Sequence, residues 1–98
     1  MHEKIASPRL DYLFDIILKL ETRAECYNFF SDLCTVPELY EMAKRMEAAK
    51  LLRHGTPYGD ITAQTGLSST TISRVNRCLR YGADGYMTQI KRHENEPI

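Results

Sequence analysis

Three arginines and a run of hydroxyl side chains recur at helical spacing between residues 68 and 80. Arg74, Arg77 and Arg80 stand three residues apart, and serine or threonine occupies five of the six positions 68–73. Arginine can bind guanine with two hydrogen bonds or pair with phosphate, and hydroxyl groups can donate to either. The segment 68–82 contains no acidic residue. This pattern predicts contact with double-stranded DNA.

A helix that ends before Gly82 would sort these residues onto two faces, at about 100° per residue. The buried face would consist of Ile72, Val75, Cys78 and Leu79. The exposed face would carry Thr70, Ser73, Arg77 and Arg80, with Arg74 towards one edge. The alternative is the solvated face of an ordinary helix, but such faces usually mix charges of both signs. We therefore favour the DNA-binding interpretation.

The stretch 57–82, PYGDITAQTGLSSTTISRVNRCLRYG, is typical of a helix-turn-helix. Gly66 stands where the first helix must end in a left-handed conformation, which glycine adopts without steric cost. Either Ser68 or Ser69 can cap the second helix. Thr56 and Pro57 are suited to open the first helix as its cap and its first residue, and Gly82 is suited to close the second.

Composition limits the other possibilities. The chain has 98 residues, a length that predicts a single domain over residues 1–98, and it carries no net charge. The charge is unevenly divided, because residues 1–41 hold four basic and eight acidic residues whereas residues 42–98 hold nine and five. The positive half is the one with the predicted helix-turn-helix, as a local electrostatic attraction for DNA requires.

Several classes of protein are disfavoured. The sequence contains no run of about 18 apolar residues, and its first residues lack the apolar core of a signal peptide, so we expect a cytoplasmic protein without membrane contact. The chain has three cysteines, Cys26, Cys34 and Cys78. Their odd number and wide spacing favour buried free thiols over disulfides or a zinc site. His2, His54 and His93 stand far apart, and we expect no enzyme, metal or cofactor site.

Three further helices are predicted over residues 7–55, and a short helix with a tail over residues 83–98. The three N-terminal helices are opened by Ser7 and Pro8, by Thr22 to Glu25, and by Thr35 to Glu38. The first two are too apolar for a monomer of this size to bury, which favours a homodimer over a compact monomer. A dimer would present two recognition helices roughly 34 Å apart and would match a palindromic operator.

The segment EAAKLLRHGTPYGDITAQTGLSSTTISRVNRCLRYGADGY resembles the Trp-repressor-like superfamily, and its SRVNRCLRYG-x-DGY ending is similar to the YerC/YecD-type branch. The resemblance is strongest over residues 47–87 and extends more loosely through the N-terminal helices. It implies an all-α fold of five to six helices, an intertwined homodimer and operator binding. The DNA-contacting positions that it implies are Tyr58, Gly59, Thr62, Ser68, Ser69, Thr70, Thr71 and Ser73.

The same resemblance implies a corepressor pocket. Its carboxylate-binding positions fall on Arg74 and on Lys44, with Arg45 adjacent, and Val75 replaces a glycine that leaves room for an indole. A branched side chain at that position disfavours tryptophan. In the alternative interpretation, Arg74 contacts DNA and Val75 belongs to the core, and we favour this one.

We therefore predict a sequence-specific DNA-binding transcriptional regulator, a repressor that acts as a dimer on a palindromic operator. Two alternatives stay open at this point. One is a regulator gated by an amino-acid-like corepressor, and the other is an adaptor whose helix-turn-helix binds protein.

Overall fold

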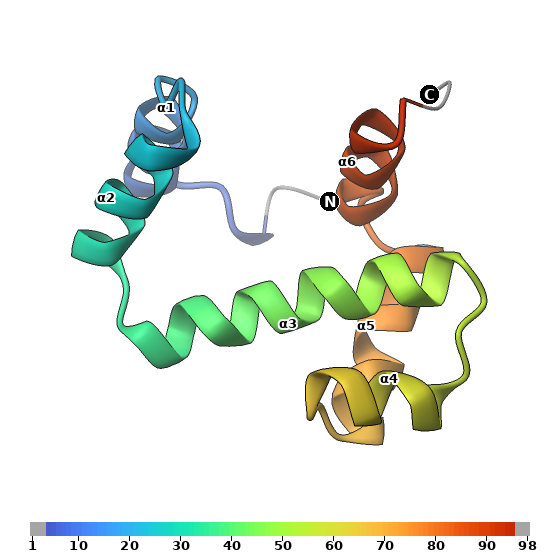
Figure 1. The fold of residues 1–98 in the computed structure, drawn as a ribbon. Coiled ribbons are helices and arrows are strands. Elements are labelled where there is room, and N and C mark those ends of the chain that lie inside the picture. The colour runs from blue at the N-terminus through green and yellow to red at the C-terminus, as the bar shows by residue number, and fades with distance from the viewer. Residues whose placement is uncertain (1–3, 96–98) are drawn as a thin grey trace. The chain divides into compact units, whose positions relative to one another are not determined.

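The computed structural model describes residues 4–95, and these form six α-helices and no strand (Figure 1). The helices are α1 (Pro8–Ile17), α2 (Arg23–Leu33), α3 (Val36–Arg53), α4 (Tyr58–Thr65), α5 (Ser69–Tyr81) and α6 (Gly85–His93). The predicted all-α class is confirmed. The predicted C-terminal helix corresponds to α6, and the end of the predicted tail, residues 96–98, lies outside the described residues.

The N-terminal helices begin where the sequence places them. Ser7 and Thr22 cap α1 and α2 through their hydroxyl oxygens. Before α3, the Thr35 backbone N–H donates to Glu38 Oε1 at 2.7 Å, and the Glu38 N–H donates to Thr35 Oγ1 at 3.3 Å. This reciprocal arrangement satisfies two backbone donors. The pKa of the Glu38 carboxyl group is lowered by the hydrogen bond from the Thr35 N–H and, to a smaller extent, by hydrogen bonding with the Thr35 side chain.

The chain divides into two compact units, of which the first ends at Leu39 and the second begins at Tyr40. This division lies inside α3. Neither α1 nor α2 contains a buried residue. Large apolar side chains of the first unit are exposed instead, among them Leu18 (79 %), Tyr27 (71 %) and Phe14 (47 %). The excess of apolar surface predicted for these helices is therefore present.

The hydrophobic core belongs to the second unit. Its buried members are Ala48, Ala49, Leu52, Ile61, Leu67, Ile72, Val75, Leu79 and Ile90. They come from the end of α3, from α4, from the turn after it, from α5 and from α6, so this core holds the two helices of the helix-turn-helix together. Among the helices within residues 4–95, none combines the length and the apolar composition that a membrane-spanning segment requires.

The predicted buried face of α5 is confirmed for Ile72, Val75 and Leu79 and is wrong for Cys78, which is exposed. Cys78 lies at the edge of the apolar stripe, where it lines a cavity instead of packing into the core. Cys26 and Cys34 are half-buried. The expectation of three buried thiols is therefore not met.

Candidate nucleic-acid interface

The turn between α4 and α5 has the geometry of a helix-turn-helix. Gly66 ends α4 with φ of 76°, in the left-handed region, and its N–H donates to the Thr62 carbonyl at 2.8 Å. Leu67 then enters the core with 4 % of its surface exposed. Of the two candidate caps, Ser68 is the one used, since its Oγ accepts the Thr71 N–H at 3.2 Å. The predicted turn is thus confirmed in its glycine and in one of its two candidate caps.

Thr65 is a structural residue of this turn that the sequence analysis missed. Its side chain is buried, and Oγ1 donates to the Ile61 carbonyl at 2.7 Å and accepts the Leu67 N–H at 3.1 Å. One hydroxyl group therefore joins the end of α4 to the first residue beyond the turn glycine. The signal was its position four residues after Ile61, on the buried face of the same helix.

The first residues of α4 differ by one position from the prediction. Pro57, rather than Thr56, is the cap residue, with φ of −63° and ψ of 150°, and its carbonyl accepts the N–H groups of Asp60 and Ile61 at 3.1 Å each. Because Pro57 keeps an extended ψ, the helix begins after it. No side chain caps this end of α4.

Gly59 and Tyr58 lie on the surface at that uncapped end. A Cβ atom added to Gly59 would meet nothing within 4 Å, so the glycine leaves an open approach to the backbone. Tyr58 is 36 % exposed. An uncapped helix end with accessible N–H groups is a common place for phosphate contact in DNA-binding proteins.

Helix α5 carries seven of the eleven predicted DNA-contacting residues. Six of the seven are exposed, namely Ser69, Thr70, Ser73, Arg74, Arg77 and Arg80, and Ser68 and Thr62 are exposed beside the helix. Thr71 is half-buried, and its Oγ1 accepts a hydrogen bond from the Ser68 hydroxyl at 3.1 Å, so it supports the cap. Arg80 also differs from the other two arginines, because its guanidinium group is already hydrogen-bonded within the chain.

A cavity of about 370 Å³ lies between α3, α5 and α6. Its lining residues are Glu41, Arg45, Thr71, Arg74, Val75, Cys78 and Tyr86. The structure thus brings together Arg45, Arg74 and Val75 of the predicted pocket, whereas Lys44 is not among the lining residues. Arg45 Nε lies 3.9 Å from Glu41 Oε1, so this carboxylate partly balances the charge of Arg45. Val75 is 2 % exposed and also belongs to the core.

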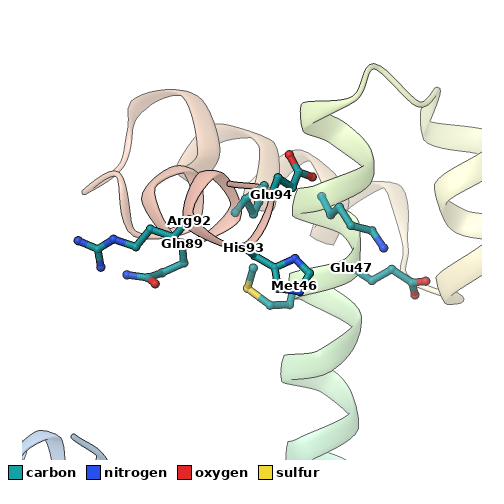
Figure 2. A pocket seen from close by; sticks show the side chains of 8 residues that line it. Met46, Glu47, Gln89, Arg92, His93 and Glu94 are labelled. Carbon is teal, nitrogen blue, oxygen red and sulfur yellow. The ribbon is translucent and has the colours of Figure 1, made fainter. Parts of the chain in front are cut away.

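A second, larger groove of about 730 Å³ separates the end of α3 from α6 (Figure 2). Met46 and Ile90 contribute apolar surface to it, and its charged and polar lining residues are Glu47, Lys50, Gln89, Arg92, His93 and Glu94. Figure 2 shows Arg92 and Gln89 directed away from α3. Near this groove His54 Nε2 lies 2.6 Å from Glu94 Oε1, so this histidine pairs with a carboxylate. No group of side chains within residues 4–95 is arranged to hold a metal ion.

Comparison with known proteins identifies the family. The family model of the Trp repressor protein matches residues 8–94. The chain is 46 % identical to the uncharacterized protein YerC of Bacillus subtilis strain 168 over 97 residues, which cover 96 % of this chain and 93 % of YerC.

Two solved structures have the same fold. A protein from Staphylococcus aureus is 44 % identical, with a TM-score of 0.91 over 100 % of this chain and 98 % of that one. A TrpR-like protein from Eubacterium eligens ATCC 27750 is 42 % identical, with a TM-score of 0.90 over 97 % and 98 %. The resemblance of the sequence is therefore confirmed, and the chain belongs to the Trp repressor family.

Proposed function

We propose that this protein is a sequence-specific DNA-binding transcriptional regulator whose helix α5 enters the major groove. One observation carries the proposal, namely the exposed face of α5, which presents Arg74 and Arg77 beside hydroxyl groups and contains no acidic residue. The capped turn and the Thr65 hydroxyl hold this face rigidly to α4. A preorganised basic face of this kind suits base and phosphate contacts.

We further propose that the regulator is a homodimer that represses from a palindromic operator. The support is the first unit, in which α1 and α2 have no buried residue while their large apolar side chains are exposed. Apolar surface of this extent is stabilised when a second copy covers it. Two copies related by a two-fold axis would then recognise two half-sites of opposite orientation.

The proposal is tested by selecting bound fragments from genomic DNA at two salt concentrations and measuring the affinity for the enriched site. A palindromic site should emerge, and Arg77→Ala should weaken specific binding by about 1–3 kcal/mol, which is about 5- to 150-fold. Arg23→Ala, which removes an exposed arginine at the start of α2, is the matched control and should leave the preference between sites unchanged.

Two results would count against it. If no fragment is enriched and DNA affinity does not depend on salt, the helix-turn-helix binds protein and the chain is an adaptor. If a site is enriched but Arg77→Ala binds it as the wild type does, the exposed face of α5 is not the contacting surface.

The cavity between α3, α5 and α6 favours a second candidate, a regulator gated by a small ligand. Arg45 and Arg74 suit a carboxylate, Glu41 suits an amino group, and Val75 narrows the space for a flat ring. A ligand that occupies this cavity should raise the melting temperature in proportion to the logarithm of its concentration above Kd. A screen of carboxylate-bearing metabolites measures this effect, and Arg74→Ala should abolish it.

A further inference from the structure

We propose that Arg80 is a positioning residue that fixes the orientation of α5, and that it is not a DNA contact. This inference rests on the proposed DNA-binding function. The Arg80 Nη2 donates to the Leu52 carbonyl at 3.3 Å, and its Nε donates to Asn76 Oδ1, also at 3.3 Å. The first bond joins α5 to α3, at a residue 28 positions earlier in the chain. The second bond holds the guanidinium group against Asn76, one turn earlier in α5.

The acceptor of the first bond is suited to a cation. Leu52 lies in the last turn of α3, where backbone carbonyls carry negative partial charge and lack helical partners. Its carbonyl also accepts the Gly55 N–H at 3.0 Å, and Gly55 has φ of 82°. The Leu52 side chain is itself part of the core. The guanidinium group therefore binds a carbonyl whose position is already held by the bond from the Gly55 N–H and by the buried side chain of Leu52.

The placement of this contact around α5 shows what it can do. At about 100° per residue, Asn76 and Arg80 lie on one side of the buried stripe of α5, and Arg74 and Cys78 lie on the other side, next to the cavity. An apolar stripe resists separation of two helices better than it resists rotation of one about its axis, because apolar contact is not directional. The bond from Arg80 to the Leu52 carbonyl is directional and lies beside the stripe, so it restrains the rotation of α5 about its axis.

Arginine suits this role better than lysine does. Its planar group offers several N–H donors in a fixed fork, so Nε and Nη2 can bind Asn76 and Leu52 together. A lysine ammonium is a point charge on a flexible stem and cannot reproduce both bonds with one geometry. Because both acceptors belong to this chain, α5 keeps its orientation without a ligand in the cavity.

Operator binding at several salt concentrations distinguishes positioning from contact. Removing an arginine that neutralises a phosphate should lower the slope of log K against log salt by about 0.9. We expect Arg80→Ala to bind the operator about ten-fold more weakly, with the wild-type salt slope and unchanged non-specific affinity. Asn76→Ala, which alters no charge, should weaken operator binding in the same sense. Arg77→Ala is the matched comparison, because it removes an arginine from the exposed face of the same helix.

Arg80→Lys provides a second readout, because lysine binds phosphate well but cannot form the two-bond arrangement. It should bind the operator as weakly as Arg80→Ala does. A third readout needs no DNA. In the free ¹⁵N-labelled protein the Arg80 Nε–H should exchange with water more slowly than the Arg77 Nε–H, and Asn76→Ala should remove that difference.

A salt slope that falls by about 0.9 in Arg80→Ala, or near-wild-type affinity in Arg80→Lys, would make Arg80 a DNA contact and overturn the inference. Equal exchange rates for the two arginine Nε–H groups would overturn it as well. If Arg80→Ala does not fold, Asn76→Ala and the exchange measurement decide the question. If the wild-type protein binds no DNA, the proposed function is refuted. The exchange rates are measured in the free protein and still test the position of Arg80, so the two failures are distinguishable.

Discussion

Replacing Phe14 by aspartate should separate the protein into monomers at concentrations at which the wild-type chain sediments at twice the mass of one chain. Phe14 is 47 % exposed on α1, a helix without a buried residue, and Leu10, Leu13 and Ile17 flank it on the apolar stripe. If a second copy covers this stripe, the substitution places a carboxylate in an apolar contact. Burial of an unpaired charge costs several kcal/mol, so the dimer should weaken about 1,000-fold or more.

Asn28→Asp is the control, because it adds the same charge at an exposed polar position of α2. Sedimentation velocity over a range of concentrations measures both variants against the wild type. A wild-type protein that stays monomeric at tens of micromolar, with a cooperative unfolding transition, would contradict the dimer. Equal dissociation of both variants would show that charge alone, and not the apolar stripe, is responsible.

Ile72→Ala should remove about 2–5 kcal/mol from the free energy of unfolding, which is a large share of the 5–15 kcal/mol typical of a native protein. Ile72 is fully buried on α5, and with Ile61 it is one of the largest completely buried side chains of the described residues. Its truncation removes apolar contact and leaves a cavity between the two helices of the helix-turn-helix. Urea denaturation measures the loss, and it must be done at one protein concentration because association would add to stability.

Ser73→Ala is the matched change on the exposed side of the same helix and should alter stability by less than about 0.5 kcal/mol. If Ile72→Ala lost less than about 1 kcal/mol, the second unit would not be held by the core described above. In Ile72→Ala the operator affinity should fall in proportion to the folded fraction of the protein. The slope of log K against log salt should stay that of the wild type, since the substitution removes no charge.

The features that local chemistry determines were predictable from the sequence. Gly66 has a left-handed φ, and Ser68, one of the two candidate serines, caps α5, because each signal acts within four residues of its own position. The start of α4 was misplaced by one residue, since proline is accepted both as the cap and as the first helical residue. The N-terminal helices began correctly for the same local reason, namely the hydroxyl caps.

Contacts between distant parts of the chain were not predictable in this way. The bond from Arg80 to the Leu52 carbonyl depends on how α5 lies against α3, and no local pattern carries that information. The choice between Lys44 and Arg45 as the carboxylate-binding residue of α3 was similarly uncertain, because neighbouring helical positions differ by about 100°. Of these two residues, Arg45 lines the cavity and Lys44 does not. Cys78 was assigned to the core from periodicity, which cannot locate the edge of a buried stripe.

The uneven distribution of the core has a consequence for the order of synthesis. Translation proceeds from the N-terminus, so α1 and α2 leave the ribosome before the residues that bury apolar side chains, which run from Ala48 to Ile90. At roughly 5–20 residues per second, the apolar helices are exposed for several seconds while the residues of the core are still being made. The nascent chain therefore presents the apolar surfaces of α1 and α2 before its core can form, and during this interval a chaperone or a neighbouring nascent chain can bind them.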